Sequence, residues 1–320
     1  MELTGCTSNV NGDKKSVRVT ASVGSLGSLQ EIAKLMPQEH QKSFNRKYGR
    51  LLDLLSIRVE ESALTALTHY WNSSLRCFEF PTFDITPTIE EYACILDIPM
   101  NEGDAYYFPM DQPPSESKVR EQFKGLLGLS EKQSRMSGHT GSRGLNRACM
   151  EDRMASLAQH NEWEGFSKIL ALEIYGLVLF PSATDIIDLA AMDVFYSVED
   201  KARNPVPTVL AETFLTLTFC HHKGKGKLQC CLQLLYVWAM SHLHVGKQIS
   251  RGSKALNVFC HLTIKSLDER RWKNEFESAE ENQFLRWVPP WYDSKQGKVI
   301  IFNCGEFPYV PLMGPKGCVT

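Results

Sequence analysis

Hydrophobic residues recur at helical spacing over most of the chain. Between residues 44 and 59 they fall at steps of three and four residues, which predicts an amphipathic helix. A second helix is expected across residues 64–71. The alternating segment Cys77–Phe80 predicts only a short strand, which Pro81 ends. Helix is therefore expected to dominate this part of the fold.

Capping signals mark where the next helix begins. Thr88 and Glu91 have the spacing of a capping box, and Thr86 is an alternative N-cap with Pro87 at the first helical position. The two alternatives place the helix start two residues apart. In both, the helix must end before Pro99.

Longer apolar segments follow in the second half of the chain. Residues 163–180 predict a largely buried helix that Pro181 ends. Thr208 is expected to cap the next helix, and Gly224 can end it in the left-handed conformation. Residues 228–244 are apolar on nearly all faces, which predicts a core helix. The last two helices together are expected to form an αα-hairpin.

Two further helices are expected near residues 256–267 and 271–285, with a strand-like segment at Val299–Phe302. Strands and helices do not alternate in the way that builds a parallel sheet. The predicted fold class is mainly α: an irregular multi-helix domain with a few short β segments.

The chain divides by composition into four parts. Residues 1–28 are polar and are expected to form a disordered tail, and residues 29–100 form an N-terminal helical part. Residues 101–150 contain several prolines and a Gly/Ser/Arg-rich stretch, which predicts a flexible basic loop between two helical subdomains. Residues 151–320 form a C-terminal helical part.

Charge and cysteine content limit the classes of protein that the sequence allows. The 320 residues contain 35 Lys plus Arg against 37 Asp plus Glu, so no overall field attracts nucleic acid or an anionic membrane. The longest apolar run includes Glu173 and is too short to cross a membrane. No export signal precedes the ten cysteines, so we expect reduced thiols and a protein that is not secreted.

Candidate chemistry is sparse. The densest set of metal-ligand residue types lacks the paired short spacing of zinc sites, so no metal is expected; it comprises Cys220, His221, His222, Cys230, Cys231, His242 and His244. The segment Lys223–Lys227 lacks the phosphate-loop pattern and is interpreted as a solvated turn. Glu90 and Glu91 are interpreted as solvated helix charges, and Glu173 as a buried carboxylate bonded to a neighbouring helix. We expect no catalytic residue and no cofactor.

Two surfaces are candidates for binding. The stretch from residue 118 to 147 is rich in Lys and Arg and predicts weak nucleic-acid contact through Lys132, Arg135, Arg143 and Arg147. An ordinary charged loop is the alternative. Trp287 and Trp291 lie in a proline-rich stretch and are candidate partner contacts, or else they cover the core of the chain.

Several segments together resemble the plant mobile domain family, also called the aminotransferase-like plant mobile domain, and in particular its uncharacterised transposon-associated branch. The likeness extends in order from about Lys34 to Gly314. The segments that carry it are Phe44–Gly49, His69–Asn72, Cys77–Phe80, Asp84–Tyr92, Gly176–Pro181, Pro205–Thr213, Gln233–Leu235 with Trp238 and His242, Cys304–Phe307 and Val310–Gly314.

The resemblance implies a helical domain found in plant transposable elements and in host genes derived from them. It further implies a nuclear location, nuclear protein partners and a link to transposon silencing or genome maintenance. Without the resemblance, a cytoplasmic location is expected. Relatives continue beyond the last matching segment, which implies truncation at the C-terminus. Our leading hypothesis is a non-catalytic interaction domain. A nucleic-acid-associated transposon protein is the alternative, and a cryptic metal-dependent enzyme is third.

Overall fold

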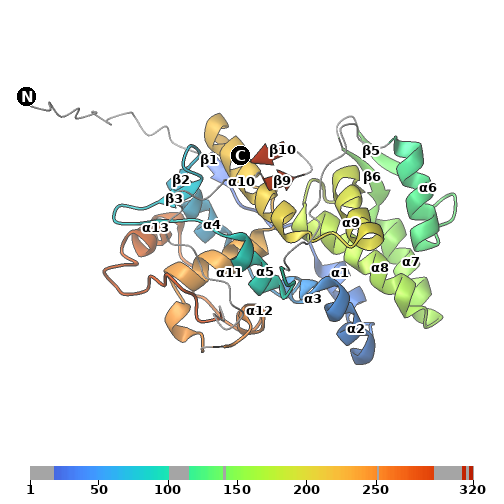
Figure 1. The fold of residues 1–320 in the computed structure, drawn as a ribbon, viewed down its shortest axis with the longest axis horizontal. Coiled ribbons are helices and arrows are strands. Elements are labelled where there is room, and N and C mark those ends of the chain that lie inside the picture. The colour runs from blue at the N-terminus through green and yellow to red at the C-terminus, as the bar shows by residue number, and fades with distance from the viewer. Residues whose placement is uncertain are drawn as a thin grey trace, which may run out of the picture.

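The computed structural model describes residues 18–100, 115–139, 142–250, 252–291, 312–314 and 317–319. They form a mainly α multi-helix domain with a few short strands, as predicted (Figure 1). No described helix combines the length and hydrophobicity that a membrane span requires.

Helices supply most of the architecture. The α-helices are α1 (Gly27–Ala33), α2 (Gln38–Tyr48), α3 (Leu51–Leu54), α4 (Glu61–Leu67), α5 (Ile89–Leu96), α6 (Glu116–Leu127), α7 (Arg147–Gln159), α8 (Trp163–Ile174), α9 (Leu189–Lys201), α10 (Val206–Lys223), α11 (Leu232–Leu243), α12 (Ala255–Phe259) and α13 (Glu269–Glu277). Short 3₁₀ or π turns are η1 (Thr68–Tyr70), η2 (Tyr175–Leu179) and η3 (Gly246–Gln248).

The strands form four small sheets. Two are three-stranded and antiparallel, in the orders β2-β3-β4 and β5-β6-β7. β1 pairs in parallel with β8, and β9 pairs antiparallel with β10. Their bounds are β1 (Arg18–Thr20), β2 (Trp71–Asn72), β3 (Cys77–Glu79), β4 (Asp84–Ile85), β5 (Met136–His139), β6 (Ser142–Asn146), β7 (Ile186–Asp188), β8 (Lys225–Lys227), β9 (Leu312–Gly314) and β10 (Gly317–Val319).

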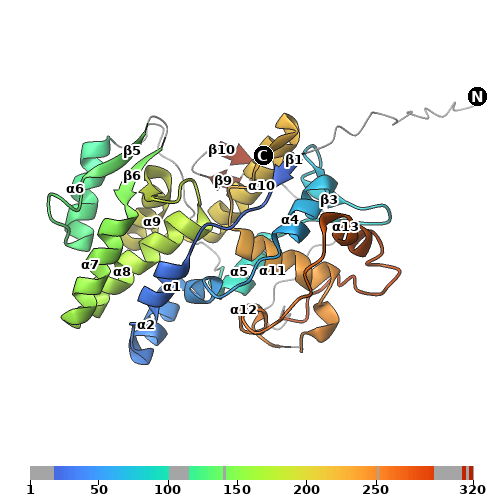
Figure 2. The ribbon, with the colours of Figure 1, turned by 180° about the vertical axis from the view of Figure 1, so that it is seen from behind.

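One hydrophobic core connects both halves of the chain. Helices that are distant in sequence pack together, with α4 against α13, α1 against α7, and α2 against α8 (Figures 1 and 2). Helices of the predicted N-terminal and C-terminal parts therefore share this core.

Two segments expected to be flexible are ordered. Residues 18–28 of the expected tail contain β1 and the start of α1, since Val19 and Leu26 are buried. Residues 115–150 of the expected loop form α6, a β-hairpin and the start of α7, with Phe123 and Leu145 in the core. Residues 1–17 and 101–114 lie outside the described residues, as does the expected strand at 299–302.

Local signals located several helix ends correctly. The capping box of Thr88 and Glu91 is present at the start of α5, and Gly224 ends α10 with a φ of 63°. The helix predicted across residues 44–59 is interrupted at Gly49, whose φ of 66° is left-handed. α10 begins at Val206, so Thr208 lies inside the helix rather than at its N-cap.

The predicted core helix is confirmed, whereas the predicted hairpin is wrong. Every residue of α11 is buried. However, α10 and α11 pack against α5 rather than mainly against each other. The connection between them contains strand β8, which pairs with β1.

Candidate functional site

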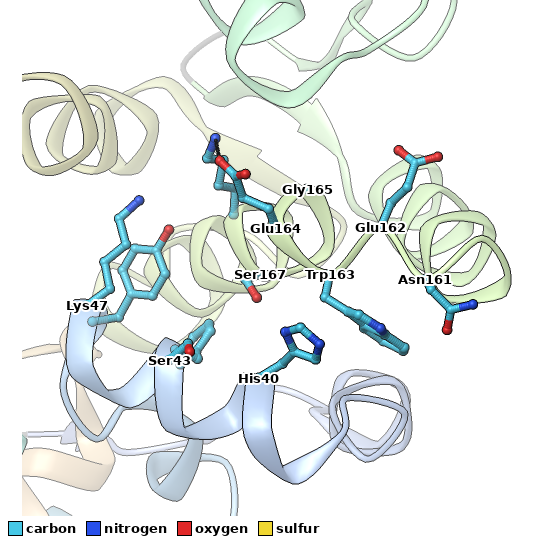
Figure 3. Close-up of a pocket in the computed structure, with 12 residues that line it drawn as sticks. His40, Ser43, Lys47, Asn161, Glu162, Trp163, Glu164, Gly165 and Ser167 are labelled. Atoms are coloured by element: carbon cyan, nitrogen blue, oxygen red, sulfur yellow. Dashed lines mark hydrogen bonds and ion pairs between the residues drawn. The ribbon is translucent and has the colours of Figure 1, made fainter.

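An open groove of about 620 Å³ lies between α2 and the start of α8 (Figure 3). α2 contributes residues one helical turn apart, which therefore share a face. Helix α8 contributes its first two turns. The lining residues are His40, Ser43, Phe44, Lys47, Tyr48, Asn161, Glu162, Trp163, Glu164, Gly165, Ser167 and Lys168.

Aromatic side chains form one wall of the groove. The rings of His40 and Trp163 stack with centroids 5.6 Å apart, and both are partly exposed (Figure 3). Trp163 also contacts the buried ring of Phe166 edge-on at 5.5 Å. Both contacts hold the indole in place, so this wall is rigid before any ligand arrives.

Hydrogen-bonding groups lie at the other end. The Lys47 Nζ is 2.8 Å from the carboxylate of Glu199, which is almost fully buried. The buried Tyr48 hydroxyl lies near this carboxylate. Burial raises the pKa of Tyr48, and the negative charge of Glu199 raises it further, so the phenol stays protonated. The groove therefore offers a fixed aromatic surface beside a lysine–carboxylate ion pair.

Two of the four predicted nucleic-acid residues, Arg143 and Arg147, already contact other side chains. Arg143 pairs with Glu116 at 2.7 Å. The Arg147 guanidinium donates to the Glu151 carboxylate, the Ser25 carbonyl and the Ser28 hydroxyl, and only 14% of its side chain is exposed. The role expected for Arg147 therefore does not hold. Lys132 and Arg135 are exposed and have no ion pair among the described residues.

Arg147 instead lines a second, smaller cavity of about 130 Å³. This cavity lies between the chain after β1 and the turn after η2, and Lys227 and Gln233 contribute to it as well. Because three donors of Arg147 are already used, its main role here is to hold α7 against residues 25–28.

The two predicted partner tryptophans differ in their surroundings. Trp287 is 48% exposed and meets Phe83 edge-on, so it remains accessible. Trp291 is only 4% exposed, and its indole N–H donates to the Ser241 hydroxyl at 2.9 Å. A partner contact through Trp291 therefore does not hold, because the indole belongs to the core.

Glu91 is buried, which corrects its interpretation as a solvated charge. One carboxylate oxygen accepts from the Trp238 indole at 2.9 Å and from the Thr88 amide at 3.0 Å. The other lies 2.8 Å from His242 Nε2. The opposite ring nitrogen of His242 contacts the Arg286 carbonyl. This network, which we call the Glu91 network, joins α5, α11 and the segment after α13, and it is fully internal.

Glu173 is the second buried carboxylate, and it lacks the hydrogen bond expected for it. It is fully buried in α8, and neither carboxylate oxygen has a hydrogen-bond partner among the described residues. Burial raises its pKa well above the usual value, and the nearby Glu151 charge raises it further against the opposing effect of Arg147. We therefore expect Glu173 to be protonated in the folded chain.

A Glu173→Gln variant should test this protonation. A raised folded-state pKa means that the folded chain binds the proton more tightly than the unfolded chain. The stability of the unsubstituted chain should then fall as pH rises above about 4.5, the ordinary pKa of this carboxyl in an unfolded chain. Glu173→Gln, which mimics the protonated acid, should be near neutral at pH 5 and stabilising at pH 8. Melting temperatures of both proteins across this range would check it, and parallel curves would contradict it.

The cysteine and histidine residues do not converge. Among the described residues no group of three or more metal-ligand side chains lies together. Burial raises the pKa of Cys231 to about 12 and that of Cys230 well above its usual value. Both thiols therefore remain protonated at neutral pH and are poor nucleophiles.

Sequence reasoning missed the groove because its two walls are about 120 residues apart. Trp163 fits the apolar pattern of α8, His40 precedes the helix predicted across residues 44–59, and Lys47 is a polar position within that helix. In the sequence, only the polar residues at helical spacing between positions 40 and 47 point to this groove. They predict an exposed helix face, but they do not show which other segment packs opposite it.

Comparison with protein families matches residues 29–320 to a domain of unknown function, DUF7745. Comparisons with curated proteins and with solved structures gave no match.

Proposed function

The chain belongs to the DUF7745 family of unknown function, and we propose that it is a non-catalytic helical interaction domain that binds a segment of a partner protein. The observation that carries the proposal is the groove between α2 and α8, with its preformed aromatic wall. Partly exposed tryptophans in rigid settings are frequent anchors of protein interfaces. The resemblance to plant mobile domains supports a nuclear setting and an origin in a transposable element.

Charge at the groove indicates the chemistry of the partner. Lys47 and Lys168 are each paired with a carboxylate, at 2.8 and 2.7 Å. Among the charged residues that line the groove, Glu162 is exposed and has no Lys or Arg partner among the described residues. The charge left unneutralised in the lining is therefore negative. A segment with a Lys or Arg beside an apolar residue would place the cation beside Glu162 and the apolar group on Trp163.

A peptide-display experiment tests the proposal. The full chain is used to select from a random heptapeptide library on phage, and enriched peptides are synthesised and titrated by fluorescence anisotropy. We expect Lys or Arg next to an apolar residue in the enriched peptides. Trp163→Ala should weaken their binding at least about tenfold, because truncating an anchor tryptophan commonly costs about 2 kcal/mol or more.

Trp287→Ala is the matched control, since it removes an accessible indole elsewhere on the chain. It should leave peptide affinity unchanged. Peptides that lose binding with Trp287→Ala but keep it with Trp163→Ala would place the partner site outside the groove. Selection of acidic peptides would contradict the charge argument, and turnover of a substrate by the purified chain would contradict the non-catalytic assignment.

A further inference from the structure

The parallel pair β1–β8 places like charges side by side. Arg18 is the register partner of Lys225, and Thr20 is that of Lys227. Residues two apart on a strand share a face, and Val19 between them points into the core. The cations Arg18, Lys225 and Lys227 therefore lie together on the exposed face of this ladder.

No described carboxylate neutralises these cations. None of the three takes part in an ion pair. Between residues 203 and 267 the only acidic residue is Glu212, which is buried in α10. Like charges directly opposite each other destabilise a sheet. The pairing is therefore maintained at a cost in stability that a bound anion would relieve.

The C-terminal end of α10 extends this charged face. α10 leads through Gly224 directly into β8, and both ribbon views show β1 beside this end of the helix (Figures 1 and 2). Lys223 is exposed and its Nζ lies 4.3 Å from the ring centroid of Phe219. Phe219 is itself 57% exposed. An accessible aromatic ring thus lies on α10 beside Lys223, the cation that precedes β8 by two residues.

We propose that this surface, the β8 surface, binds single-stranded nucleic acid; it consists of Arg18, Phe219, Lys223, Lys225 and Lys227. Phosphates would contact the four cations and a base would stack on Phe219. Binding of single strands without sequence preference commonly combines a cationic track with exposed aromatic rings. The β8 surface is separate from the groove between α2 and α8, so it goes beyond the proposed function and can fail independently of it.

Salt dependence gives the first measurement. A fluorescein-labelled oligothymidine 20-mer is titrated with the full chain at several salt concentrations. Four phosphate contacts predict a slope of about −3 in the logarithm of the association constant against the logarithm of salt, at about −0.7 per contact. A slope near zero would overturn the proposal.

Two charge-matched triple variants locate the surface. Arg18→Gln/Lys225→Gln/Lys227→Gln should weaken binding more than tenfold and reduce the slope to about −1, since Lys223 alone remains. Lys118→Gln/Lys132→Gln/Arg135→Gln removes the same charge from the exposed, unpaired cations near α6 and should leave both quantities unchanged. Equal losses in the two variants would overturn the assignment to the β8 surface. The first variant should melt no lower than the unsubstituted chain, which separates lost binding from lost folding.

Phe219→Ala tests the preference for single strands. Its ring is exposed, so the substitution should leave folding intact while reducing oligothymidine affinity about tenfold. Affinity for a duplex of the same length should not change. Unchanged oligothymidine affinity, or duplex binding tighter than single-strand binding, would overturn the single-strand assignment. Equally tight binding of polyglutamate would assign the surface to acidic proteins instead.

Discussion

Replacement of Glu91 by alanine should destabilise the folded chain by about 3–5 kcal/mol. The substitution leaves the Trp238 indole N–H, the Thr88 amide and the Nε2 of His242 without their acceptor in the core. Buried donors without partners cost far more than a hydrogen bond contributes on balance. Urea unfolding followed by far-UV circular dichroism would measure the loss as a lower midpoint.

Glu90→Ala is the matched control because Glu90 is the exposed neighbour of Glu91 in the same helical turn. It should change the free energy of unfolding by less than about 0.5 kcal/mol. If the two variants unfolded at the same urea concentration, the Glu91 network would not stabilise the packing of α5 against α11.

Gly144→Ala should lower the free energy of unfolding by a similar amount, about 3 kcal/mol or more. This loss is at or above the upper end of what overpacking a core usually costs. Gly144 lies on β6 opposite Asp188 of β7. A Cβ at this position would lie 1.8 Å from the Ile187 carbonyl oxygen, which is backbone and cannot rotate away. The sheet β5-β6-β7 would have to separate locally. A lower melting temperature and faster amide exchange in β6 and β7 would show it.

Gly125→Ala is the control for Gly144→Ala, since the same substitution at this position should stabilise the chain. Gly125 lies on the exposed face of α6, and the Cβ that alanine would add meets no atom within 4 Å apart from its chain neighbours and the nearby backbone of its own helix. Alanine should stabilise this helix by up to about 1 kcal/mol. A similar loss of stability in both glycine variants would show that close approach to Ile187 is not the cause.

The Glu91 network shows where sequence reasoning succeeds and where it stops. The capping box is visible in the sequence because Thr88 and Glu91 are three residues apart and interact within one turn. The same carboxylate also accepts from Trp238, 147 positions later. The capping-box spacing distinguishes Glu91 from its exposed neighbour Glu90 but does not indicate burial, so the sequence predicts both carboxylates to lie in solvent.

The predicted charged loop differs from the observed surface for a similar reason. The sequence predicts a basic stretch, but Glu116 pairs with Arg143, and Glu131 pairs with both Arg120 and Lys124, once α6 and the hairpin have formed. The shorter segment Lys223–Lys227 was interpreted as a solvated turn. Lys225 of this segment lies beside Arg18 only because β1 and β8 pair, and these strands are about 200 positions apart in the sequence.

The sequence by itself determined the fold class, the core character of α11 and several helix ends, because hydrophobic periodicity and capping act over a few residues. Tertiary structure alone decided which helices meet, and with them the groove, the Glu91 network and the β8 surface. Each of these joins residues from distant elements, and the contacts form only when the shared apolar core brings those elements together. Trp163 lies beside His40 where α2 and α8 also bury Phe44 and Phe166 in the shared core. Neither segment alone contains that information.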